Sequence, residues 1–69
     1  MESEFNKLPL EFQENITNSK ILLNGFVHED SPEQQTASFD INGITKEAVF
    51  KLIELEDGTK QYEFDYLAY

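Results

Sequence analysis

The sequence of 69 residues contains no cysteine and no arginine, and it has only three glycines and two prolines. The absence of cysteine excludes a disulfide framework, a thiolate nucleophile and a cysteine-based metal site. The glycines stand apart from one another, which excludes a glycine-rich phosphate cradle. No apolar run reaches the length of a membrane span, and the N-terminus lacks the basic start of a signal peptide. We therefore expect a cytoplasmic protein that carries no cofactor.

Positive charge is scarce in this chain. Fourteen Asp and Glu residues stand against five Lys, so the formal net charge is −9. Nucleic acids and anionic membranes attract clustered Lys and Arg, so we expect neither as a direct partner. The partner that this charge favours is a protein with a basic surface.

The length allows one domain, over residues 1–69. At this size folding buries only roughly 60% of the unfolded chain's surface, so the core is thin. Six Phe and three Tyr nevertheless supply enough apolar area to offset chain entropy.

The N-terminal third predicts one helix with an apolar stripe. Leu8, Phe12 and Ile16 recur every four residues, and Phe5 extends the stripe from just before the helix. We expect Asn6 as the N-cap and Pro9 in the first turn.

We predict that the helix ends at Asn18-Ser19, because these side chains compete for backbone hydrogen bonds. Residues 20–28 then predict a strand, with a bulge at Gly25, that either joins the sheet or stays outside it. Residues 29–35 predict a flexible acidic loop that contains Pro32.

Three further strands follow from Thr36 onward, with turns at Asn42-Gly43 and Asp57-Gly58. At the second turn, a three-residue loop places Lys51 opposite Glu63, whereas a two-residue loop places Lys51 opposite Phe64. We predict the three-residue loop, with Glu54 opposite Lys60. At the first turn we predict a four-residue connection, residues 42–45, which places Phe39 opposite Ala48.

This register gives the sheet one apolar face, which the helical stripe is free to cover. The predicted fold is therefore α+β, with one N-terminal helix packed on an antiparallel β-meander of three or four strands. The expected members of the covered face are Ala37, Phe39, Ile41, Ala48, Phe50, Leu52, Tyr62, Phe64 and Tyr66.

The opposite sheet face combines an apolar strip with an acidic rim, which suggests a contact surface. Single apolar residues are also common on exposed strands, and the N-terminal residues could cover this side instead, so these explanations stay open. The predicted partner-binding residues are Asp40, Glu47, Val49, Ile53, Leu55, Glu63, Asp65, Leu67 and Tyr69.

Catalytic chemistry finds little support in the sequence. His28 is the only imidazole, and its acidic neighbours suit a solvated loop residue better than a general base. Glu63 and Asp65 have the spacing of paired carboxylates, but this is equally the pattern of a solvated strand. The acidic runs lack the spacing of a calcium loop. We expect no catalytic residue, no metal ligand and no enzymatic activity.

The predicted meander has three features in order along the chain. An aromatic strand with Phe39 and Ile41 ends in a turn at Gly43, and a central apolar strand follows. The last strand comes after Gly58 and contains Tyr62-Glu63-Phe64 and Tyr66-Leu67. Residues 36–69 thereby resemble the C-terminal meander of the mitochondrial inner-membrane family that contains a presequence-translocase subunit and a cytochrome oxidase assembly factor. The resemblance implies a protein that binds partners without catalysis. The family's transmembrane anchor and basic targeting sequence have no counterpart in these 69 residues.

Two hypotheses for the function of this chain remain. The first is an acidic, non-enzymatic inhibitor, of the kind some phages encode, which occupies a basic nucleic-acid-binding surface of another protein with carboxylates in place of phosphates. The second is an assembly or scaffold module that binds through the apolar sheet face, with a homodimer as one form of the assembly. Rising salt should weaken the first contact and spare the second.

Overall fold

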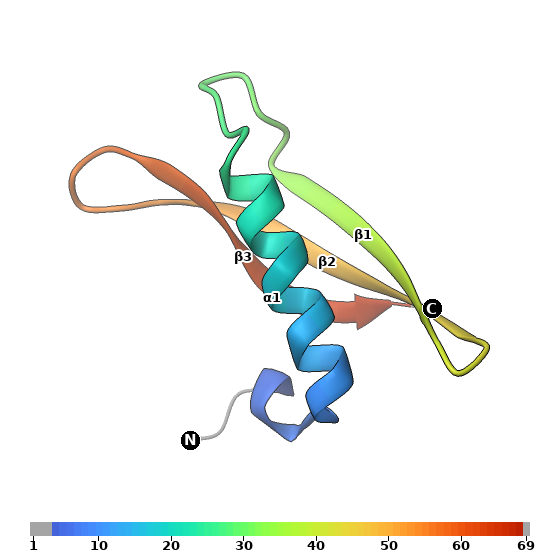
Figure 1. The fold of residues 1–69 in the computed structure, drawn as a ribbon. Helices are drawn as coiled ribbons and strands as arrows, with labels where there is room; N and C mark the ends of the chain where they lie inside the picture. The colour runs from blue at the N-terminus through green and yellow to red at the C-terminus, as the bar shows by residue number, and fades with distance from the viewer. Residues whose placement is uncertain (1–3, 69) are drawn as a thin grey trace.

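A computed structural model describes residues 4–68. A short 3-10 helix, η1 (Glu4–Lys7), precedes the single α-helix α1 (Leu10–Asn24). The strands β1 (Gln34–Ile41), β2 (Ile44–Glu54) and β3 (Lys60–Ala68) follow and form an antiparallel sheet in the order β1-β2-β3. α1 runs across one face of this sheet and leaves the other face open (Figure 1). The predicted α+β meander is confirmed, with three strands in the described part of the chain.

The helix differs from its predicted limits at both ends. Pro9 is the N-cap residue and not part of the first turn, and Asn6 lies inside η1. At the other end, α1 continues through the predicted stop at Asn18 and ends where Gly25 follows it. The predicted strand over residues 20–28 is therefore wrong, because its first half is helical and its second half is loop.

Contacts with the sheet explain why the helix continues. Leu23, in the last turn of α1, packs against the core cluster. Asn24 binds the backbone of Tyr62 on β3 through its side chain. Packing of this kind commonly outweighs the local preferences of polar residues such as Asn18 and Ser19.

The predicted helical stripe forms the interface with the sheet. Ile16 is buried, and it lies in a core cluster with Ala48, Phe50 and Tyr62. The rings of Phe12 and Phe39 lie 5.8 Å apart between centroids. Phe5 and Leu8 pack against the same core, and the centroid of the Phe5 ring lies 6.0 Å from that of Phe64.

The β1–β2 hairpin has a tighter turn than predicted. Ile41 pairs directly with Ile44, and only Asn42 and Gly43 lie between them, with φ angles of 54° and 80°. Positive φ at both central residues is the requirement of a type I′ turn, which Asn-Gly satisfies. The predicted four-residue connection is wrong by two positions in register. A shift of two residues keeps every side chain on its predicted face, because strand side chains alternate.

The β2–β3 hairpin follows the predicted three-residue loop as far as Phe64, with Glu54 opposite Lys60 and Lys51 opposite Glu63. A bulge then interrupts the register, since Phe50 pairs with Phe64 but Val49 pairs with Tyr66. One extra β3 residue, Asp65, reverses the faces of the residues that follow it.

The bulge corrects two predictions. Tyr66, expected in the covered face, lies opposite Val49 and is 44% exposed. Leu67, expected on the partner-binding face, pairs with Ala48 and packs against the core.

Candidate functional site

The open sheet face carries only part of the predicted contact surface. Asp40 and Glu47 lie diagonally across the β1–β2 pair, where Asp40 pairs with Thr45 and Ser38 with Glu47. Ile53 is half-buried on the same face. Val49 is only 4% exposed, so a partner could not contact it extensively.

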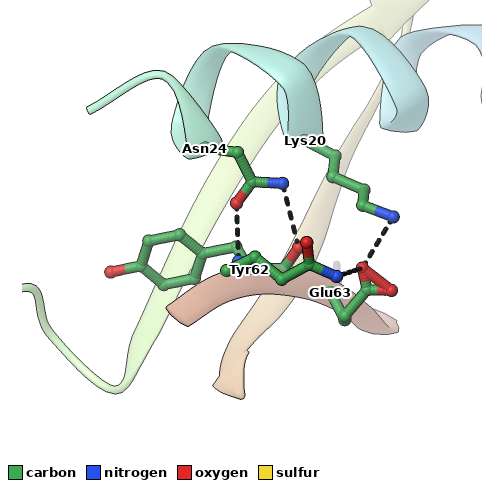
Figure 2. Close-up of polar contacts among 5 residues, drawn as sticks. Lys20, Asn24, Tyr62 and Glu63 are labelled. Atoms are coloured by element: carbon green, nitrogen blue, oxygen red, sulfur yellow. Dashed lines mark hydrogen bonds and ion pairs between the residues drawn. The ribbon is translucent and has the colours of Figure 1, made fainter. Parts of the chain in front are cut away.

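One member of the predicted carboxylate pair on β3 is already engaged by the helix. Glu63 forms an ion pair with Lys20 of α1, with 2.6 Å between Nζ and Oε2, and Gln61 donates a hydrogen bond to the same oxygen at 3.1 Å (Figure 2). Asp65, at the bulge, is exposed. Glu63 and Asp65 therefore do not act as two equivalent free carboxylates.

The remaining apolar members of the predicted strip are dispersed. Leu55 lies in the loop after β2 and is partly exposed, while Leu67 is partly buried and packs against the core. Tyr69 lies outside the described residues. Within residues 4–68, the predicted apolar strip is interrupted because Leu67 lies on the other face of the sheet.

The end of α1 is fixed to the edge of β3 by hydrogen bonds that the sequence pattern did not reveal. Asn24 Oδ1 accepts from the Tyr62 backbone N–H at 2.6 Å, and Asn24 Nδ2 donates to the Tyr62 carbonyl at 3.4 Å. Figure 2 shows Asn24 and Lys20 reaching from one side of the helix to neighbouring residues of β3. The Asn24 amide thus supplies the donor and acceptor that another strand would supply at this edge.

Tyr62 also fixes the loop that follows α1. Its buried side chain extends toward the start of β1, where the hydroxyl donates to the Pro32 carbonyl at 2.6 Å. Within this loop, the His28 backbone N–H donates to Ser31 Oγ at 2.8 Å, and the Ser31 N–H donates to the His28 carbonyl at 3.1 Å. These bonds define the conformation of residues 28–32, and the last two residues of the predicted loop 29–35 belong to β1.

The helix crosses the sheet diagonally. Its first half contacts the end of β1 through Phe12 and Phe39, and its last residue contacts the start of β3 through Asn24 and Tyr62. A diagonal helix leaves two corners of the sheet without helical cover. Phe5 of η1 packs on Phe64 beside one end of α1.

The corner above the start of β1 holds an open hollow of about 710 Å³. Its walls come from the end of α1, the following loop, β1 and β3. They are lined mainly by apolar groups and include Leu22, Leu23, Phe26, Pro32, Gln35 and Tyr62.

Large apolar side chains are exposed at the end of α1 and just after it, and Leu22 and Phe26 among them line this hollow. Ile21, Leu22 and Phe26 are 63%, 66% and 73% exposed, and we call these three residues the apolar patch. The strand predicted over residues 20–28 contained all three residues, so the patch was missed. Leu22 and Phe26 line the same hollow although Phe26 lies beyond the end of α1.

Acidic residues gather next to the apolar patch. The α1–β1 loop contributes Glu29, which lines a second hollow together with Glu54 and Lys60 of the β2–β3 hairpin. His28 and Asp30 line both hollows, so the two adjoin. We call the carboxylates of these two segments the acidic loops: Glu29, Asp30, Glu33, Glu54, Glu56 and Asp57.

The tip of the β2–β3 hairpin stabilises its own negative charge. Asp57 Oδ1 accepts hydrogen bonds from the Thr59 hydroxyl at 2.7 Å and from the Thr59 backbone N–H at 3.0 Å. These two bonds, the hydroxyl bond first, hold the pKa of Asp57 below its ordinary value of 3.8. Asp57 is therefore ionised throughout the physiological range.

No group of three or more His, Asp or Glu side chains within residues 4–68 is arranged to hold a metal ion. No helix in that range is long and apolar enough to cross a membrane. Comparison of the chain with protein-family models, curated proteins and solved structures finds no match. The surface of the domain itself is therefore what bears on its function.

Proposed function

We propose that this chain is a small acidic protein-binding domain, without catalytic activity, that inhibits a partner by occupying its basic, nucleic-acid-binding surface. The observation that carries the proposal is the junction of the apolar patch and the acidic loops at one end of the domain, where His28 and Asp30 line both hollows. Apolar side chains supply buried area in such a contact, and surrounding carboxylates select a cationic partner and speed encounter.

The charge balance at this end supports the same function. The acidic loops carry six carboxylates, and the lysines that line hollows with them are Lys51 and Lys60. The resemblance of residues 36–69 to a family of partner-binding proteins points in the same direction. Localisation in the cytoplasm, where such a partner would be met, is part of this proposal.

An affinity capture with matched charge variants tests the proposal. Glu29→Gln combined with Glu56→Gln removes one charge from each acidic loop, while Glu11→Gln combined with Glu14→Gln removes two charges from the exposed side of α1 near its start. We expect the first pair to weaken capture of a basic protein from lysate of the source cell or its host at low salt. The second pair should leave capture unchanged, and an equal loss in both pairs would show that only net charge matters.

A second candidate is an assembly module, and the exposure of the apolar patch favours it. The contact would then be apolar, with charge only at its rim, and a homodimer is one form it could take. Phe26→Ser should abolish a salt-resistant complex or dimer in sedimentation analysis. Retention of the complex in that variant would exclude the patch as the contact.

A further inference from the structure

The two edge strands of the sheet, β1 and β3, differ in the contacts that other parts of the chain make with them. At β3, Asn24 pairs with both backbone groups of Tyr62, Lys20 binds Glu63, and Phe5 covers Phe64. The outward backbone groups of Tyr62 are therefore occupied by a side chain of the same domain, which discourages pairing with another strand at this point of the edge.

The β1 edge carries no such protection. The Leu52 backbone N–H donates to the Glu33 carbonyl at 2.8 Å, which shows that the odd-numbered residues of this segment turn their backbone groups toward β2. The backbone groups of Thr36, Ser38 and Asp40 therefore point away from the sheet. No hydrogen bond from any other part of residues 4–68 reaches them.

The sequence of β1 also lacks the usual devices that discourage strand addition. It contains no proline, no lysine and no bulge along its eight residues, and its one charged side chain is Asp40. A regular edge of this length has three outward pairs of backbone donor and acceptor between Thr36 and Asp40, which is enough to bind an extended peptide.

The hollow beside Gln35 lies next to this free edge. Gln35 belongs to β1 and lines the hollow with Leu22 and Phe26, so the hollow opens on the helix side of the strand. Side chains of an added strand alternate between the two sheet faces, and those on the helix side would meet the hollow. The edge supplies backbone pairing, and the hollow supplies a place for one apolar side chain.

We propose that an extended segment of the basic partner adds to β1 as a fourth strand and places an apolar side chain in the hollow. This inference rests on the proposed function and specifies how the partner is bound. Charge selects the occupant: Asp30 lines the hollow, and Glu33 and Asp40 flank the edge at its two ends. A second copy of this chain would bring its own net charge of −9, so a segment carrying Lys or Arg fits better.

A designed peptide tests the edge without knowledge of the partner. The probe is acetyl-Lys-Val-Lys-Phe-Lys-Val-amide, and two controls carry N-methyl groups either on the three lysines or on the three apolar residues. In an added strand, the N–H groups of alternate residues point toward β1 and those between them point to solvent. The control that is methylated on the N–H groups facing β1 should lose about tenfold or more in affinity. The other control should bind like the unmodified probe. In the complex, amide exchange should slow at Thr36, Ser38 and Asp40.

Equal affinity of all three peptides, or no binding of the unmodified probe, would overturn the edge site. A dimer of the free protein that is lost in Ser38→Pro would also overturn it, because a second copy would then occupy β1. Proline at this position removes a donor that points away from the sheet, which edge strands tolerate.

The same variant separates this inference from the proposed function. If Ser38→Pro captures the basic partner with unchanged affinity and salt sensitivity, the proposed function stands and strand addition is refuted. If the peptide pairs with β1 but no basic partner is captured, the edge site stands and the proposed function fails.

Discussion

Replacement of Asn24 by alanine should measure how strongly the helix is held to the β3 edge. The side chain makes two hydrogen bonds to the backbone of Tyr62, at 2.6 and 3.4 Å, and both residues are shielded from bulk water. Asn24→Ala leaves a partly buried N–H and carbonyl without partners, which costs about 1–3 kcal/mol in the free energy of unfolding. For a domain of this size, each kcal/mol lowers Tm by about 4–8 °C.

Asn18→Ala is the matched control for that variant. Asn18 is exposed on the same helix, and its side chain makes no hydrogen bond within residues 4–68. Alanine is the better helix former by up to about 0.7 kcal/mol, so the control should be neutral or slightly stabilised. Thermal and urea unfolding give both free energies, and hydrogen exchange at the Tyr62 amide gives the local effect. Equal stability of Asn24→Ala and Asn18→Ala, with unchanged exchange at Tyr62, would refute the reasoning.

Two further predictions concern the bulge and the acidic tip. Leu67→Glu should destabilise the fold by roughly 2 kcal/mol because it replaces apolar packing against the core with a partly buried carboxylate. Tyr66→Glu should change stability much less, because Tyr66 is 44% exposed. Similar losses in denaturant unfolding would contradict the bulge. Thr59→Val should raise the pKa of Asp57 in an NMR titration, because the hydroxyl bond that lowers it most is gone. Since the folded pKa of Asp57 is depressed, its contribution to stability is present above about pH 4 and disappears as pH falls through the folded pKa. The free energies of unfolding of wild type and variant should therefore converge in acid. An unchanged Asp57 titration would disprove the role of the hydroxyl.

The sequence was sufficient for the parts of the fold that depend on periodicity. Leu8, Phe12 and Ile16 at helical spacing, and the alternating strand residues, correctly predicted which helical stripe covers the sheet. The charge pairing of Lys51 with Glu63 correctly selected the three-residue loop. Patterns of this kind are visible in sequence because one whole face of an element must be apolar.

The errors arose where one tertiary contact or one backbone angle decides the outcome. Residues 21–23 are apolar and suit a strand or a helix, and the bonds of Asn24 to Tyr62 accompany the helical form. The extra residue at Asp65 moved Leu67 from the predicted binding face to the side of the sheet that packs against the core. The apolar patch was missed because its residues were predicted to lie in a strand, so the candidate site was less predictable than the fold.

The affinity of the chain for its captured basic partner, measured by calorimetry at low and then at physiological salt, tests the acidic docking surface most directly. The Debye length shortens from about 30 Å at 0.01 M to about 8 Å at 0.15 M salt, which screens the field of the acidic loops. We predict a steep fall in affinity, and a smaller fall when Glu29→Gln and Glu56→Gln are combined. An affinity that does not change with salt in either protein would contradict an acidic inhibitor and favour an apolar assembly contact.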